Sequence, residues 1–221
     1  MKKSLIFNTD KYKIIEDDIV KLINSQPDFL SVRTVDSTRA VGDAIQTIIS
    51  DNLRSLLGDL CADYSAQFAR RSMADLAFTD NNGFYYIVDV KTHRLETQFN
   101  MPNITSVERL TRFYEDDNNY FVVLFASYTI RDVKVLVEKV HFIPVEFFSW
   151  NCLTIGALGW GQIQIANSNA ININEGYSRK RWILELCDIM LEFYPREINK
   201  IENRINHFKR VKKEWESKID S

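Results

Sequence analysis

Residues 75–90 read Asp75-Leu76-Ala77-Phe78-Thr79-Asp80-Asn81-Asn82-Gly83-Phe84-Tyr85-Tyr86-Ile87-Val88-Asp89-Val90. Two runs rich in aromatic and β-branched residues flank Asn82-Gly83, a pattern that predicts a β-hairpin. If the chain turns there or one residue earlier, the numbers of paired residues add up to about 163–165, and Asp75 lies opposite the segment around Asp89. Because side chains alternate along a strand, Asp89 and Lys91 share one face. The hairpin is therefore expected to bring two carboxylates and one amine together.

Amphipathic helices are expected on both sides of this hairpin. Apolar residues recur at spacings of three and four over residues 11–23 and 41–57, as they do on the buried face of a helix. Further helical segments are expected over residues 59–70 and 107–114. Because proline removes a backbone donor, the C-terminal region predicts two helices separated by Tyr194-Pro195. These two helices cover residues 180–193 and 196–215.

Further strands complete the predicted sheet. Residues 120–126 are apolar throughout, which is typical of a strand buried on both faces. Residues 133–142 are expected to pair with them, and residues 162–166 predict another strand. The order of the elements predicts an α/β or α+β fold, in which helices flank a mixed central sheet.

The composition excludes several classes of protein. Of the 221 residues, 45% are hydrophobic and 26% charged, which is ordinary for a globular chain. The 28 Lys and Arg against 30 Asp and Glu give a net charge of −2, so an overall basic surface for nucleic acid is excluded. Residues 179–218 carry 11 basic and 7 acidic side chains, a pattern equally typical of a phosphate-binding face and of a solvated helix. We expect a cytoplasmic protein with reduced cysteines and no membrane partner, because no apolar run is long enough to span a bilayer and no secretory signal is evident.

The residue types at the hairpin point to a divalent metal ion. Asp75 and Asp89 would supply carboxylate oxygens with no His or Cys in register, which suits Mg²⁺ or Mn²⁺ better than zinc. Like charges placed opposite each other destabilise a sheet unless a cation compensates them. Lys91 would add a positive charge or a proton-transfer group. The alternative is a solvated Asp, Asp and Lys set at the edge of a sheet.

Several motifs in a fixed order extend this hypothesis. They are Gly42-Asp43-Ala44-Ile45, Ala74-Asp75 with Asp89-Val90-Lys91-Thr92, Pro102-Asn103-Ile104-Thr105-Ser106, Trp160-Gly161-Gln162-Ile163-Gln164 and Tyr177-Ser178-Arg179-Lys180-Arg181-Trp182. Together they resemble type II restriction endonucleases of the PD-(D/E)XK superfamily, in the EcoRV-like branch with HincII and SwaI. The chain departs from the pattern at Ala74, where the motif has proline, and at Asp43, where it has glutamate. Asp43 is equally typical of a carboxylate that the helix dipole favours near a helix N-terminus.

The resemblance implies a PD-(D/E)XK restriction-endonuclease-like fold and a set of catalytic residues. Asp75, Asp89, Lys91 and Asp43 would be catalytic. Asp75, Asp89 and the backbone carbonyl of Val90 would hold Mg²⁺, for which Mn²⁺ would substitute. A single domain over residues 1–221 is expected, with an N-terminal helical segment at 1–40, a catalytic core at 41–170 and C-terminal helices at 171–221.

DNA contacts are expected from loops beside the sheet. Amide side chains pair with adenine or probe the minor groove, a glycine-rich loop lets backbone approach base edges, and basic side chains bind phosphate. The candidates are Gln98, Asn100, Asn103, Thr105, Gly159, Trp160, Gln162, Arg179, Lys180, Arg181 and His93. The alternatives are solvated loop amides and an ordinary turn.

By this resemblance the chain is a Mg²⁺-dependent, site-specific deoxyribonuclease that hydrolyses both strands of double-stranded DNA. It would act as a homodimer on a short palindrome, leave 5′-phosphates and blunt ends, and belong to a restriction-modification system with a cognate DNA methyltransferase. Two alternatives stay open. One is a PD-(D/E)XK repair or structure-selective nuclease, and the other is a non-catalytic DNA-binding or helical interaction protein that uses the helix at 196–215.

Overall fold

The computed structural model describes residues 4–27, 30–31, 33–65, 74–97 and 100–218. The chain forms two compact units, Met1–Glu175 and Gly176–Ser221. Within the described residues, no helix combines the length and the apolar character that crossing a membrane requires.

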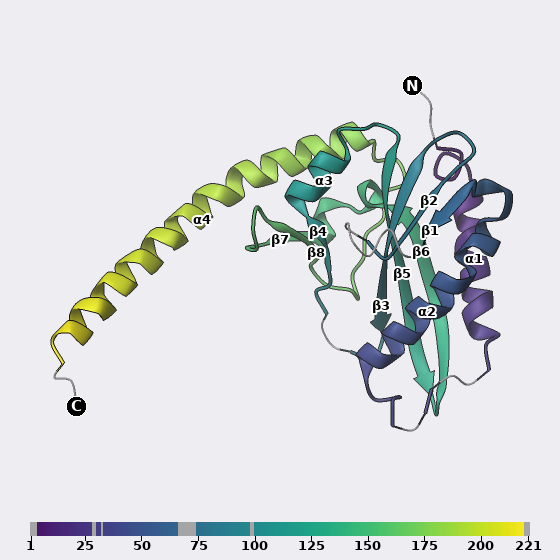
Figure 1. The fold of residues 1–221 in the computed structure, drawn as a ribbon, viewed down its shortest axis with the longest axis horizontal. Helices are drawn as coiled ribbons and strands as arrows, with labels where there is room; N and C mark the ends of the chain where they lie inside the picture. Colours follow the sequence, from purple (N-terminus) through teal and green to yellow (C-terminus); the bar gives the residue numbers. More distant parts are fainter. Residues whose placement is uncertain (1–3, 28–29, 32, 66–73, 98–99, 219–221) are drawn as a thin grey trace. The chain divides into compact units, whose positions relative to one another are not determined.

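A mixed five-stranded sheet lies at the centre of the first unit (Figure 1). Its strands run in the order β1-β2-β3-β5-β6, with bounds β1 Asp63–Ser65, β2 Leu76–Thr79, β3 Tyr85–Arg94, β5 Asn119–Arg131 and β6 Lys134–Pro144. β3 and β5 are parallel, and the other neighbours are antiparallel. The expected α+β class with a mixed central sheet is therefore confirmed, and so is the pairing of β5 with β6.

The predicted hairpin of β2 and β3 is confirmed, including its register. Leu76 pairs with Val88 and Thr79 with Tyr85, so paired residue numbers add up to 164 as expected. Gly83 adopts a φ of 83°, a conformation that glycine takes without a steric penalty. Asp80 organises the turn, because its Oδ1 accepts hydrogen bonds from the backbone N–H of Asn82 at 2.8 Å and of Phe84 at 3.0 Å.

Asp80 is expected to hold this hairpin together. Its Oδ2 also accepts a hydrogen bond from the Tyr86 hydroxyl at 2.8 Å, and Asp80 is buried. Asp80→Ala removes the acceptor of three hydrogen bonds, two of them from the buried residues Phe84 and Tyr86, so we expect the free energy of unfolding to fall by about 2–4 kcal/mol. Urea denaturation measures this loss. Asp18→Ala, at an exposed carboxylate on α1, is the control, and an equal effect of both variants would contradict the role of Asp80.

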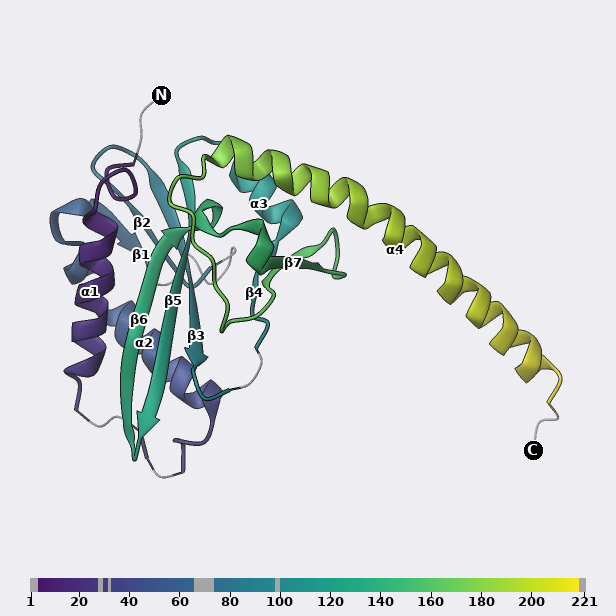
Figure 2. The ribbon, with the colours of Figure 1, turned by 180° about the vertical axis from the view of Figure 1, so that it is seen from behind.

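Helices α1 (Lys11–Asn24) and α2 (Thr38–Leu57) cover one face of the five-stranded sheet (Figures 1 and 2). Both were expected from their periodicity, and both bury the predicted apolar face, with Ile15 and Ile19 in α1 and Ile45 and Ile49 in α2. The side chain of Ser37 caps α2 by accepting a hydrogen bond from the backbone of Ala40 at 3.2 Å. The two helices therefore provide the apolar layer that supports the strands of the site.

Glu16 joins α1 to β6 and should make the fold sensitive to alkaline pH. Its carboxylate accepts a hydrogen bond from the backbone N–H of Phe142 at 2.7 Å, and burial raises its pKa to about 7 from 4.5. A carboxyl whose pKa is raised on folding loses stabilisation as the pH rises through the folded value. We therefore expect Glu16→Gln to be more stable than the wild type above pH 7, by about 1–2 kcal/mol after solvent screening, with no gain near pH 5. Thermal unfolding across pH measures the difference, and a pH-independent gain would contradict it.

A second, three-stranded sheet follows in the order β4-β8-β7. Its strands are β4 Asn103–Ser106, β7 Leu153–Gly156 and β8 Gln162–Ile165. The predicted strand at β8 is confirmed, as is the helix α3 (Val107–Phe113) that follows β4. The sequence analysis did not predict β4 and β7. Short 3₁₀ helices η3 (Val145–Phe147) and η4 (Trp150–Cys152) connect β6 to β7.

The helix expected over residues 59–70 is wrong in its described part. A 3₁₀ turn, η1 (Gly58–Leu60), ends α2, and β1 then pairs with β2 from Asp63 to Ser65. Pairing with the edge of the hairpin overrides the local helical pattern, because strand formation depends on neighbouring strands more than on the segment itself. The remainder of this expected helix, residues 66–70, lies outside the described residues.

The break expected at Tyr194-Pro195 is also wrong. A single helix, α4, runs from Arg179 to Glu216 with Pro195 inside it. Proline lacks an N–H and removes one helical hydrogen bond. The helix nevertheless continues past the proline for a further 21 residues, to Glu216.

Candidate metal and DNA site

Asp75 directly precedes β2 and lies beside Asp89 in the neighbouring strand β3. Continuing the register from Leu76 and Val88 puts Asp75 beside Asp89. The backbone N–H of Asp75 donates to the carbonyl of Val88 at 3.0 Å, and its Oδ2 accepts from the backbone N–H of Val90 at 2.8 Å. Asp75 is therefore bound to the residues on both sides of Asp89.

Asp89 is a buried carboxylate in the middle strand of the five-stranded sheet. Its Oδ1 accepts a hydrogen bond from Nζ of Lys91 at 2.7 Å. Its Oδ2 is buried and has no hydrogen-bond partner within the described part of the chain. Burial raises the pKa of Asp89 from 3.8 to about 7; Lys91 opposes the rise, and the charge of Asp75 adds to it. A carboxylate in this position would be stabilised by a further cation.

The donor set fits a hard divalent cation. Two carboxylates meet here, one of them with an unpartnered oxygen, and carboxylate and carbonyl oxygens are the ligands that Mg²⁺ and Mn²⁺ prefer. Over the described ranges, no cluster of three or more His, Cys, Asp or Glu has the geometry to hold a metal ion. Ligands beyond the two carboxylates would therefore be backbone oxygens or water, as is usual for Mg²⁺.

Asp43 lies apart from this pair in its described contacts. It is exposed in the first turns of α2, and its carboxylate is 3.9 Å from Nε of Arg39. The neighbouring Gly42 faces β3, since a Cβ there would lie 2.7 Å from Oγ1 of Thr92. Alternation along β3 sends Thr92 to the face opposite Lys91, so this helix supports the strand from behind. A side chain at this position would force the hydroxyl of Thr92 to move.

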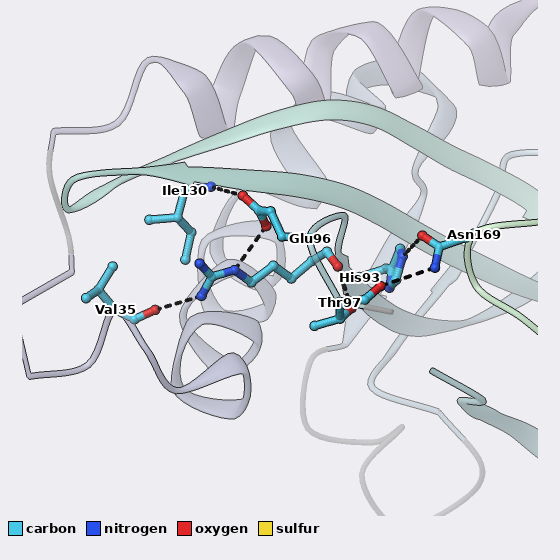
Figure 3. Close-up of polar contacts among 7 residues, drawn as sticks. Val35, His93, Glu96, Thr97, Ile130 and Asn169 are labelled. Atoms are coloured by element: carbon cyan, nitrogen blue, oxygen red, sulfur yellow. Dashed lines mark hydrogen bonds and ion pairs between the residues drawn. The ribbon is translucent and has the colours of Figure 1, made fainter. Parts of the chain in front are cut away.

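His93 continues the face of Asp89 and Lys91 and is buried, and its Nδ1 has no hydrogen-bond partner among the described residues. Its Nε2 is 2.8 Å from Oδ1 of Asn169, whose Nδ2 donates to the carbonyl of Thr97 at 3.2 Å (Figure 3). With 1% of its surface exposed, His93 has no surface for the DNA contact expected from the sequence. It instead ties the end of β3 to the loop after β8.

A second set of contacts in Figure 3 fixes the chain just after β3. Glu96 accepts a hydrogen bond from the backbone N–H of Ile130 at 3.4 Å and pairs with Nε of Arg94 at 3.0 Å. Arg94 also donates to the carbonyl of Val35 at 3.3 Å. These contacts anchor the start of the loop in which the amide candidates lie.

Four of the proposed recognition residues, Asn103, Thr105, Gln162 and Trp160, lie in the three-stranded sheet or in its β7–β8 loop. Asn103 is exposed in β4, and its Oδ1 accepts a hydrogen bond from Gln164 at 2.6 Å. Thr105 is buried, Gln162 pairs with Ser106 across the ladder, and Trp160 is 55% exposed near Arg112. Trp160 of the β7–β8 loop and Arg112 of α3 therefore bring an aromatic and a basic side chain together.

The remaining candidates lie at other places. Gly159 in the β7–β8 loop has a φ of 57°. A residue with a side chain would be strained in this backbone conformation. Asn100 accepts two hydrogen bonds from Ser168 through its carbonyl, both at 3.0 Å. Gln98 lies outside the described residues. Arg179, Lys180 and Arg181 form the first turn of α4 in the second unit, where Arg181 pairs with Glu185 at 3.1 Å.

Two polar residues near the site were not among the sequence candidates. Gln164 holds Asn103, and Asn169 holds His93. Gln164 is two residues from Gln162 and shares its face of β8, so alternation could have identified it. Nothing local in the sequence indicates Asn169, because its contact joins residues 76 positions apart. No family model matches the chain, and no curated protein matches it significantly.

Proposed function

We propose that this protein is a Mg²⁺-dependent site-specific deoxyribonuclease with a PD-(D/E)XK restriction-endonuclease-like fold. The observation that supports it best is the pair of the half-buried Asp75 and the buried Asp89, with one oxygen of Asp89 unpartnered among the described residues and the other bound to Lys91. Burying charge in this way is costly unless a ligand compensates it. Functional sites are where such costs are usually found.

The residues have distinct roles in this proposal. Asp75, Asp89 and the carbonyl of Val90 would hold Mg²⁺, which when bound neutralises charge on a phosphate and acidifies a water molecule. Asp75 is kept in position by the backbone N–H of Val90. Lys91 would orient the attacking water or move its proton, because its ammonium group is held beside Asp89 by the 2.7 Å bond. Asp43 would assist from α2 only if its side chain left Arg39.

Recognition would fall to the three-stranded sheet and its loops. Asn103 and Gln162 carry amides that suit base edges, and Trp160 with Arg112 suits stacking and phosphate contact. Arg179, Lys180 and Arg181 would add phosphate contacts from α4. Because a duplex has two strands related by a dyad, a homodimer would cut a palindrome on both strands. A methyltransferase of the same specificity would protect the host DNA.

Digestion of a sequenced plasmid tests the proposal. With Mg²⁺ or Mn²⁺ we expect reproducible fragments whose ends map to one short palindrome, with 5′-phosphates and blunt ends, and no cutting in EDTA. Nicks or cuts only at branched DNA would instead indicate a repair or structure-selective nuclease of the same fold. DNA that stays intact with either metal, across a set of plasmids and phage genomes, would contradict nuclease function.

A further inference from the structure

Helix α4 carries a continuous apolar stripe on its exposed surface. Leu191 is 73% exposed, Phe208 68% and Trp215 65%. The stripe repeats every seven residues at two positions, which we name a and d as in a coiled-coil heptad. Position a holds Leu184, Leu191, Ile198, Ile205 and Lys212. Position d holds Cys187, Tyr194, Ile201, Phe208 and Trp215.

The length and regularity of this pattern indicate a helical partner. From Leu184 to Trp215, over more than four heptads, the a and d positions are apolar except at Lys212, and a seven-residue repeat of this kind supercoils two helices around each other. At 1.5 Å per residue the stripe is about 46 Å long. Exposed apolar patches of this size mark interaction surfaces. Ile201, Ile205 and Phe208 also line a shallow hollow whose rim is Arg204, Lys209 and Lys212.

The charges beside the stripe disfavour a parallel pair of these helices. In a parallel coiled coil, the residue that precedes position a in one helix lies beside the residue that follows the next position d in the other helix. Glu197 would face the partner's Glu202, and Arg204 would face the partner's Lys209. Like charges at these positions oppose association.

In an antiparallel pair, Glu197, Arg204 and Lys209 instead each meet an opposite charge on the partner. If facing core residues have numbers that add up to 399, Ile198 faces the partner's Ile201 and Leu191 faces the partner's Phe208. The same register sets Glu197 opposite the partner's Arg204 and Asp188 opposite the partner's Lys209. Two-fold symmetry doubles each contact. It also overlaps the whole stripe, since Leu184 then faces the partner's Trp215.

We propose that α4 binds α4 of a second copy of this chain as an antiparallel two-stranded coiled coil centred between Asn199 and Lys200. The hollow at Ile201, Ile205 and Phe208 then receives the partner's Leu191, Tyr194 and Ile198. The interface does not depend on the metal site or on nuclease activity. Its tests use purified protein without DNA or metal, so their failure and that of the proposed function are distinguishable.

Sedimentation equilibrium of the full chain tests the dimer. We expect a dimer for the wild type, and a dissociation constant at least about 100-fold higher for Ile201→Asp, because each copy then buries a charge in a core layer. Ile201 is 49% exposed, so the variant should retain its fold, which circular dichroism checks. Asn203→Asp, at the opposite side of the helix, is the matched control and should dimerise as the wild type does. A monomeric wild type, or equal effects of both variants, overturns the proposal.

Charge reversal tests the orientation through the sign of its effect. Glu197→Arg sets like charges against the partner's Arg204, so we expect it to weaken the dimer roughly 10-fold. Adding Arg204→Glu restores opposite charges and should restore affinity. In a parallel dimer, Glu197→Arg would instead face the partner's Glu202 and strengthen association, which would overturn the proposed orientation.

Disulfide trapping gives an independent measure of the register. In a Cys187→Ser background, chains with Leu191→Cys and chains with Phe208→Cys are oxidised separately and as a mixture. We expect an interchain disulfide only in the mixture, because position 191 faces position 208 of the partner. Dimers trapped from either variant alone would show each position facing itself, as in a parallel coiled coil, and would overturn the proposal.

Discussion

Asp89→Asn should abolish DNA cleavage while leaving the protein folded. The change removes the negative charge but keeps the shape of the side chain, and Oδ1 can still accept the hydrogen bond that Lys91 donates at 2.7 Å. The site then lacks one of its two anionic ligands. Losing several kcal/mol of metal-dependent charge stabilisation lowers the cleavage rate roughly 10³-fold or more.

Two measurements separate this expectation from simple unfolding. Plasmid cleavage with Mg²⁺ gives the rate, and urea denaturation in EDTA gives the stability, which should not fall because a costly buried charge has been removed. Asp18→Asn is the control, since that carboxylate is exposed on α1 and pairs with Lys21 at 2.9 Å. Unchanged cleavage by the Asp89 variant would remove the basis of the proposed metal site.

The hairpin could be predicted from sequence because its determinants are local. Asn82-Gly83 fixes the turn, the alternation of Val88, Asp89 and Val90 fixes the faces, and together they give the observed register. The approach of Asp75 to Asp89 follows from that register alone. The amphipathic helices α1 and α2 were predictable for the same reason, since each repeats its apolar positions over several turns.

Contacts between distant segments could not be predicted in this way. β1 was expected to be helical because its local pattern does not show that the edge of β2 is free to pair with it. His93 was expected to contact DNA because it lies close to Lys91 in the sequence. The sequence does not show its contact with Asn169, which lies 76 positions away. Pro195 was expected to break the C-terminal helix because it removes one helical hydrogen bond, yet α4 continues through it.

The buried, unpartnered oxygen of Asp89 could not be predicted from the sequence either. Spacing predicted that Asp75, Asp89 and Lys91 would be close, but it did not indicate which of them would be buried. Burial of Asp89 in the middle strand makes its charge costly, whereas the same three residues at an open edge would be solvated. This distinction separates a site that favours a cation from an ordinary polar edge.

Lys91→Met should impair both cleavage and stability, and the loss of stability should depend on pH. Methionine keeps most of the length of the side chain but removes the ammonium group that pairs with Asp89 at 2.7 Å. Loss of a positioned proton-transfer group lowers the cleavage rate roughly 10²–10⁴-fold. Metal binding, which uses Asp75 and Asp89, should persist, so that isothermal titration calorimetry with the metal ion distinguishes Lys91→Met from Asp89→Asn.

The sign of the pH effect follows from the raised pKa of Asp89, about 7 in the folded protein against 3.8 ordinarily. Such a group loses stabilisation as the pH rises through its folded pKa. Removing Lys91 moves that pKa higher still, because the ammonium group lowers it. In EDTA the variant and the wild type should therefore be about equally stable near pH 5.5, where Asp89 is protonated in both, and differ by about 2–3 kcal/mol near pH 9. Lys21→Met, which removes an exposed partner of Asp18, should show no such divergence. A constant difference across pH would mean that Lys91 does not compensate the buried charge of Asp89.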